Sequence, residues 1–139
     1  MIQFIVHGRP SPAGSKRHVG NGILVDSSGE KGKAWRSVVQ DSARQVFNGD
    51  LLRGPLRVQF VFYKPRPKGH FGTGSKASTL KADAPEYPTG RPDCLKLARA
   101  VEDALTGVVW ADDSQIVDEQ LVKCYGEPAR CAVMISELK

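Results

Sequence analysis

The sequence has no long hydrophobic run, few aromatic residues and only three scattered cysteines. Its apolar stretches fall short of the roughly 20 residues that a membrane-spanning helix needs. The opening MIQFIVHGRP has no basic segment ahead of its apolar one, so we expect no signal peptide. Cys94, Cys124 and Cys131 lack a CxxC spacing, which argues against a zinc site or a disulfide framework. We therefore expect a cytoplasmic protein, without a membrane partner, whose thiols are reduced and at least half-buried.

The charge balance points to a nucleic-acid partner. The chain has 139 residues, the size of one domain, with 20 Lys and Arg against 15 Asp and Glu. A net charge of +5 favours binding to a polyanion. The aromatic content of 7% argues against platforms that stack single-stranded bases. We find neither a helix-turn-helix nor a zinc-finger pattern, so a domain that reads base sequence is not favoured.

Hydrophobic periodicity predicts strands and two helices within a single domain, residues 1–139. Alternating or β-branched runs predict strands at 2–7, 23–25, 55–64, 116–126 and 129–138. Helical spacing of Trp35, Val38, Val39, Ala43, Val46 and Phe47 predicts a helix over 33–48, and a second is predicted over 94–106 before Gly107. The last two runs, joined across Glu127-Pro128, are predicted to form an antiparallel hairpin. The expected class is α+β, with a mixed or antiparallel sheet.

Basic residues collect in two segments rich in Gly, Pro and Ser. One follows the first strand, and the other is the long segment 65–92, which we call the 65–92 arm. A segment of this length without periodicity is usually functional or disordered. We expect it to be a mobile loop that orders on a polyanion; a merely solvated insertion is the alternative. The residues predicted to bind DNA are Lys16, Arg17, Arg66, Lys68, Lys76, Arg91 and Lys96.

The predicted helix 94–106 has a polar face that contains one leucine. At about 100° per residue, Cys94, Leu97, Ala98, Val101, Ala104 and Leu105 share the core side. Lys96, Arg99, Glu102 and Asp103 fall opposite, and Leu95 falls among them. Packing of the helix on its own core does not explain this leucine.

The acids around this helix have an ordinary interpretation and a chemical one. Asp93 can cap the helix, and Asp112-Asp113 can form a turn. Together with nearby cations, however, these carboxylates are what phosphodiester cleavage requires. Oxygen ligands hold Mg²⁺, and cations position the phosphate.

The segment RPDCLKLARAVEDALTGVVWADDSQIVDEQLVK resembles the signature of the RusA-type Holliday junction resolvases. That pattern has Pro-Asp-x-Asp-Asn-Leu, a Lys or Arg one turn later, Asp-Ala-Leu-(Asn/Thr)-Gly and Asp-Asp-x-Gln. The opening VHGRPSPAGSKR resembles the family's first strand and basic loop. The matching residues are Pro92-Asp93, Leu97, Arg99, Asp103–Gly107 and Asp112–Gln115.

The resemblance implies a homodimeric α+β endonuclease, in many cases from a phage or prophage, acting in bacterial cytoplasm. Such enzymes resolve four-way DNA junctions by paired Mg²⁺-dependent nicks, with Mn²⁺ as a substitute ion. Asp93 and Asp113 would be catalytic, metal-binding carboxylates, with Asp112 as a less secure third ligand. Arg99 stands where a catalytic Lys is common. Because Arg stays protonated, it can clamp a phosphate but not donate a proton.

The sequence departs from this pattern at Leu95, where the family has a second acid, and at Lys96, where Asn is usual. Losing one carboxylate should weaken Mg²⁺ binding. Asp112 or Asp103 could complete the site. Glu102 is a further candidate, although two helical turns, ~10 Å of rise, separate it from Leu95. The remaining alternative is a protein that binds branched DNA and cleaves it poorly.

Overall fold

The computed structural model describes residues 1–14, 16–18, 20, 22, 24–26 and 29–139, with the backbone alone at 16–18 and 24–26. The strands are β1 (Ile2–His7), β2 (Lys16–His18), β3 (Leu24–Asp26), β4 (Leu56–Lys64), β5 (Ile116–Tyr125) and β6 (Arg130–Glu137). The α-helices are α1 (Gly29–Val46) and α2 (Cys94–Leu105), and short 3₁₀ helices are η1 (Lys68–His70), η2 (Gly74–Lys76) and η3 (Asp113–Gln115). The predicted α+β class is confirmed.

The main sheet has the order β1-β6-β4-β5. β6 pairs antiparallel with both β1 and β4, whereas β4 and β5 run parallel, so the sheet is mixed. The predicted hairpin of the last two strands is therefore wrong, because β4 lies between β5 and β6. The connecting loop passes the end of β4, where the Gly126 amide donates to the Lys64 carbonyl at 3.0 Å. Alternation identifies a strand with one buried face but does not identify its neighbours.

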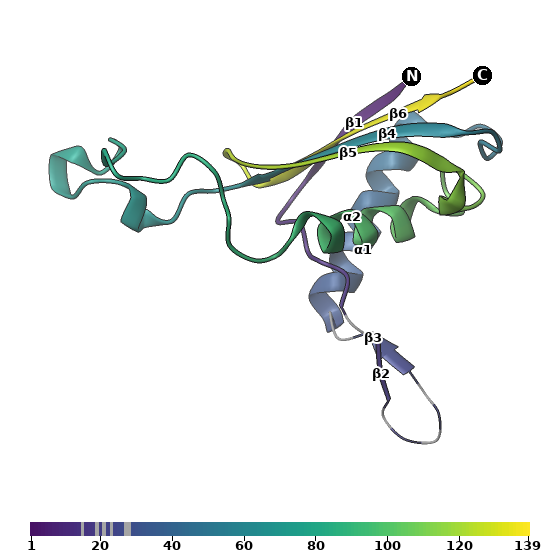
Figure 1. Ribbon diagram of the computed structural model, residues 1–139, viewed down its shortest axis with the longest axis horizontal. Coiled ribbons are helices and arrows are strands. Elements are labelled where there is room, and N and C mark those ends of the chain that lie inside the picture. The colour runs from purple at the N-terminus through teal and green to yellow at the C-terminus, as the bar shows by residue number, and fades with distance from the viewer. Residues whose placement is uncertain (15, 19, 21, 23, 27–28) are drawn as a thin grey trace.

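Both helices cover one face of this sheet and leave the other open (Figure 1). Leu56, Val58, Phe60 and Phe62 of β4 alternate toward the helices and are buried. They form the core with the inner faces of α1 and α2. The Gln40 amide of α1 also donates to the Ala104 carbonyl of α2 at 3.2 Å, which links the helices. Among the described helices, none combines the length and apolar character that a membrane crossing requires.

α1 starts four residues earlier than predicted, and part of its predicted apolar face is exposed. Trp35, Val39 and Ala43 are buried as expected. Val38 and Val46 are exposed, so their assignment to the packed face is wrong. The buried residues recur at intervals of four, and Val38 lies one position off that stripe. α2 matches its prediction closely, and β3 overlaps the strand predicted at 23–25, although Ile23 lies outside the described residues.

The 65–92 arm extends away from the sheet and folds back on itself (Figure 1). Its outward and returning halves are joined by a bridge between Phe71 and Leu80. The Lys81 amide also donates to the His70 carbonyl at 2.9 Å. The arm therefore contains η1, η2 and local turns where the sequence showed no periodicity. Its predicted mobility stays a prediction.

Candidate functional site

α2 positions the residues that sequence analysis singled out. Its buried side is the predicted one with Ala100 added, except that Cys94 is only half-buried. Leu95 is 70% exposed, which confirms that it lies on the polar face. Arg99 is exposed on the same side, three residues before Glu102 and four before Asp103. Residues at these spacings are neighbours on a helix surface, so a cation and two acids share one strip of α2.

Asp93 is the N-cap of α2, as its ordinary interpretation predicted. Its Oδ2 accepts from the Lys96 amide at 3.4 Å, which satisfies one of the free amides of the first turn. Two lysines of the sheet hold the chain just before it. Lys123 Nζ donates to the carbonyls of Gly90 and Pro92 at 2.8 and 3.1 Å, and Lys64 Nζ contacts the Arg91 carbonyl at 3.4 Å. The sheet thus fixes where α2 begins.

The pair Asp112-Asp113 lies at the start of η3, just before β5. Asp112 Oδ1 accepts from the Ser114 amide at 2.9 Å, and this bond lowers the pKa of the Asp112 carboxyl. Gln115 Oε1 accepts from the amides of Ala111 and Asp112 at 3.0 and 2.8 Å, which closes a capping box. Asp112 therefore has a structural role here. Both acids of the pair are exposed, and Asp113 is the first residue of η3.

The side-chain amide of Gln115 joins η3 to the segment before β4. Its Nε2 donates to the carbonyls of Leu52 and Gly54, each at 2.9 Å. Trp110 packs in the core beneath η3. It is fully buried, in agreement with its predicted packing role, and its indole donates to Thr106 Oγ1 at 2.9 Å. These contacts fix the position of Asp113 relative to the end of α2.

A carboxyl cluster joins α2, η3 and β5. The pKa of Glu102 is raised to about 8, first by burial and then by the charge of Glu119 and a hydrogen bond with it. The charges of Asp113 and Asp103 raise it further. Crowded carboxyls resist simultaneous ionisation, so Glu102 keeps its proton near neutral pH. We call Glu102, Asp113 and Glu119 the carboxyl cluster.

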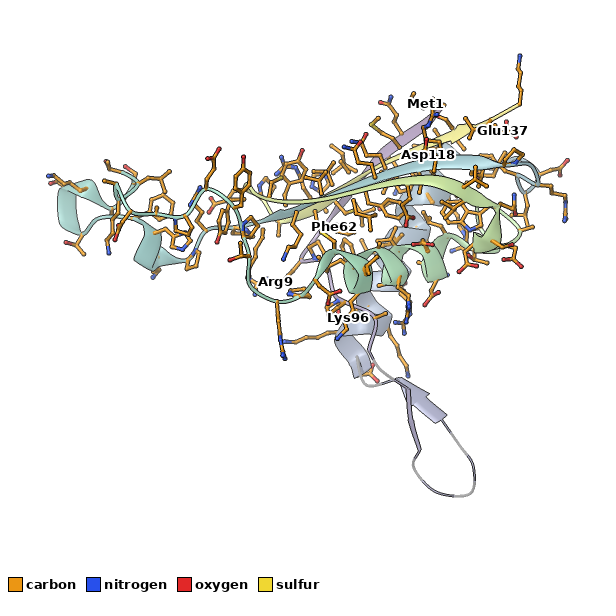
Figure 2. All side chains as sticks on the ribbon, in the orientation of Figure 1. Met1, Arg9, Phe62, Lys96, Asp118 and Glu137 are labelled. Atoms are coloured by element: carbon orange, nitrogen blue, oxygen red, sulfur yellow. The ribbon has the colours of Figure 1, made fainter. Side chains whose placement is uncertain are left out.

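Glu119 is the member that sequence analysis missed. It pairs with Val58, whose side chain is buried on the helix side of the sheet. Its neighbour Asp118 forms an ion pair with Arg57 at 2.7 Å. Figure 2 shows Asp118 on the open face, across the sheet from α2. Alternation along residues 116–125 gave only a weak signal, because Lys123 falls on the same side of the strand as Glu119.

The cluster suits a hard divalent cation in its chemistry. Its donors are carboxylate oxygens, which Mg²⁺ prefers, and a bound cation would replace the proton that Glu102 keeps. Within the described part of the chain, however, no group of three or more His, Cys, Asp or Glu residues is arranged so that it could hold a metal ion. Nine residues, ~13 Å of helix rise, separate Asp93 from Glu102. The two acids predicted to bind the metal, Asp93 and Asp113, are thus associated with opposite ends of α2.

The predicted DNA-binding residues surround the start of α2 and continue into the 65–92 arm. Arg91 and Lys96 are exposed at the helix start, and Lys68 and Lys76 are exposed in η1 and η2. Arg66 is more constrained, since its guanidinium lies 4.3 Å from the centre of the Tyr125 ring and donates to the Pro85 carbonyl at 2.6 Å. The side chains of Lys16 and Arg17 lie outside the described residues. Their loop is tied to α2 because the Ala13 amide donates to the Lys96 carbonyl at 2.9 Å.

The cysteines are free, with Cys131 buried and Cys94 and Cys124 half-buried, as predicted. Burial raises the pKa of the Cys131 thiol to about 12 and also raises that of Cys124. These thiols are therefore protonated at neutral pH and poor metal ligands.

Comparison with known proteins identifies the family of this chain. The model of the family described as endodeoxyribonuclease RusA matches residues 8–136. An uncharacterised protein of Bacillus subtilis (strain 168), YqaN, is 33% identical over 139 residues, covering 99% of this chain and 96% of that protein. RusA-family proteins are divalent-metal-dependent endodeoxyribonucleases that act on branched DNA. The chain belongs to the RusA endodeoxyribonuclease family.

Proposed function

We propose that this protein is a Mg²⁺-dependent endonuclease that resolves four-way DNA junctions by paired symmetrical nicks. The observation that carries the proposal is the carboxyl cluster, whose member Glu102 lies on the same strip of α2 as Arg99. Carboxylates for a metal and a fixed cation for a phosphate are the two requirements of phosphodiester hydrolysis.

In this proposal, Glu102, Asp113 and Glu119 hold the metal. When bound, Mg²⁺ supplies an activated water and offsets charge on the scissile phosphate. Glu102 would act as a ligand in its ionised form, with Asp113 and Glu119 beside it. The cluster thereby compensates for the missing acid at Leu95, a role that sequence analysis had considered for Glu102, Asp103 and Asp112. Mn²⁺ would fit the same oxygen donors.

Arg99 has a positioning and electrostatic role. It lies one turn before Glu102, and its guanidinium stays charged at all relevant pH values. It therefore holds a phosphate oxygen while the proton moves through water or a carboxyl. Asp93 remains a predicted catalytic carboxylate by resemblance to the family. Its capping bond to Lys96 and its distance along α2 favour a separate role for it in orienting the helix.

Paired nicks require two sites, and a two-fold homodimer is the simplest assembly that supplies them. The basic residues of the 65–92 arm and of the loop after β1 would contact the junction strands, because phosphate contacts dominate such affinity. We further propose that the protein comes from a phage or prophage and acts in the bacterial cytoplasm.

One observation favours a second function, a junction-binding protein with impaired cleavage. Leu95 is exposed in the first turn of α2, where it gives no ligand to a metal. A site that needs an acid there would bind the junction through its cations and leave it intact.

A labelled four-way junction tests both functions. The wild-type protein, Asp113→Asn and Leu95→Asp are scored for gel shift and cleavage on the same samples, with and without Mg²⁺. We expect symmetrical Mg²⁺-dependent nicks from the wild type and binding without nicks from Asp113→Asn. Asp41→Asn on α1 is the control, because Asp41 is exposed and pairs only with the nearby Arg44 at 3.7 Å among the ion pairs described. Cleavage that appears only in Leu95→Asp would favour the second function.

A further inference from the structure

A pocket of about 450 Å³ lies where β4 and β5 end beside the start of α2. Its walls come from segments that are far apart in the sequence. They are residues 9–10 after β1, residues 62–67 at the end of β4, residues 90–92 before α2, Leu97 on α2, Lys123 on β5 and Ala129 before β6. A pocket of this volume is within the range of small-ligand sites.

The charged residues of this pocket are all cationic. Arg9, Lys64, Arg66, Arg91 and Lys123 line it, and its lining contains neither Asp nor Glu. Lys64, Arg66 and Lys123 already donate to main-chain carbonyls. Arg9 and Arg91 make no side-chain hydrogen bond or ion pair with another residue that the structure describes. Two cations thus remain available to an anion, while the other three keep the walls in place.

The remaining wall is apolar. It includes Phe62 and Leu97, which belong to the core, and the rings of Pro10, Pro65 and Pro92. An inorganic anion alone gains nothing from such a wall, because removing a charge from water against apolar groups is unfavourable. A ligand that combines a phosphate with a flat apolar body would use both parts of the pocket.

We propose that this pocket binds one unpaired nucleotide of a DNA strand, with its base against Leu97 and the prolines and its phosphate at Arg9 and Arg91. This proposal rests on the proposed function and adds a contact by which the junction is held. Flipping a base out of a duplex costs free energy, and this cost is least for a base that is already unpaired. Pro92 lines the pocket and precedes Asp93, so the nucleotide is held at the end of α2 opposite the carboxyl cluster.

The test is a titration of the full-length protein with a deoxynucleoside monophosphate, followed through the NMR signals of the Leu97 methyl groups. The titrants are dCMP, dAMP, 2-deoxyribose 5-phosphate and inorganic phosphate. We expect saturable shifts with the nucleotides, because the ring current of a base acts on a methyl group beside it. We expect binding at least threefold weaker for the sugar phosphate. Equal binding of inorganic phosphate would overturn the role of the base, and the absence of any saturable shift would overturn the site.

Two variants sharpen this titration. Arg9→Ala should weaken nucleotide binding at least fivefold, whereas Arg53→Ala, exposed and outside the lining, should leave it unchanged. Ala129→Leu adds volume at the wall and should weaken binding of dCMP more than that of phosphate. Equal nucleotide binding by the wild type and Arg9→Ala would contradict the proposed phosphate position.

Junction cleavage, assayed in parallel, separates this proposal from the proposed function. A wild-type protein that binds nucleotides without cutting the junction retains the pocket and contradicts the nuclease assignment. One that cuts the junction without binding nucleotides contradicts the pocket alone.

Discussion

The two ends of α2 carry opposite charge, and in the order that a helix disfavours. Apart from the capping Asp93, the charged residues at the start are the cations Arg91, Lys96 and Lys123, while the second half carries Glu102 and Asp103. The first turn has no acid and the last turn no base. A helix dipole favours anions at the start and cations at the end, each by about 0.3–1 kcal/mol. Stability therefore does not account for this arrangement.

Charged ligands account for it better. A phosphate at the helix start would be attracted both by the cations and by the dipole, and a metal ion at the other end by the carboxyl cluster and by the opposite pole. The buried face of α2, which includes Val101, Ala104 and Leu105, packs on the core and so fixes the positions of both ends of the helix. The comparison therefore predicts two different effects of substitution. Substitutions at the acidic end should lower the rate of junction cleavage, and substitutions at the basic end should lower the affinity for the junction.

The largest effect is expected from Glu119→Gln at the acidic end. Removing one carboxylate from the proposed metal site should lower junction cleavage about 100-fold, which corresponds to about 2.7 kcal/mol in the barrier. The matched control is Asp118→Asn, one residue away on the open face of the sheet, where the change removes only an exposed ion pair with Arg57. Single-turnover cleavage rates at saturating protein measure both. If Asp93→Asn abolishes cleavage while Glu119→Gln does not, the metal site lies at the other end of α2.

At the basic end, Arg91→Ala should reduce affinity rather than the rate of cleavage. Losing one phosphate contact should weaken junction binding about tenfold and reduce the slope of log affinity against log salt by about one. Arg44→Ala on α1 removes an equally exposed arginine and should leave both unchanged. Gel-shift titrations over a range of salt give the slopes. An unchanged slope in Arg91→Ala would mean that this arginine does not contact the backbone of the DNA.

A smaller effect is expected on stability against pH. The folded-state pKa of Glu102, about 8, lies above its ordinary value of 4.5, so the folded protein binds more protons than the unfolded chain between these values. The free energy of unfolding of the metal-free protein should therefore fall as pH rises from about 5 to 9. After screening by solvent at this half-buried site, we expect a loss on the order of 1 kcal/mol.

Glu102→Gln should flatten that dependence, because the amide does not titrate. Glu137→Gln, at the exposed end of β6, should retain the slope of the wild type. Urea unfolding at several pH values, in a chelating buffer, measures all three proteins. A wild-type protein whose stability rises over this interval would contradict the raised pKa.

The structure also shows which parts of the site were predictable from the sequence. The face of α2, the capping Asp93 and the exposed Leu95 depend on local periodicity, which the sequence displays directly. Glu119 depends on the pairing of β5 with β4, a contact between residues far apart in the chain. The predicted hairpin placed β5 beside β6, and with that neighbour the relation of Glu119 to α2 could not be recognised.

The cationic pocket was missed for a similar reason. Arg66 and Arg91 were predicted to bind DNA, but Arg9, Lys64 and Lys123 come from three other segments that meet only in the fold. The strand order decides that β5 ends beside residues 90–92, where Lys123 reaches two carbonyls. Composition indicated a basic protein, whereas only the tertiary arrangement gathers these cations around one cavity.

The smallest effect on cleavage is expected from Leu95→Asp. The size of this effect shows which end of α2 binds the metal. Because Leu95 is exposed, replacing it costs little packing, and an acid in the first turn of a helix is favourable by a few tenths of a kcal/mol. If the metal binds at the carboxyl cluster, the new carboxylate lies about two turns away and should change the cleavage rate less than threefold. Leu95→Asn, of nearly the same size but neutral, is the control. A large gain in cleavage with Asp and none with Asn would place the metal at the start of α2, and the carboxyl cluster would then be a structural feature of the β5 edge.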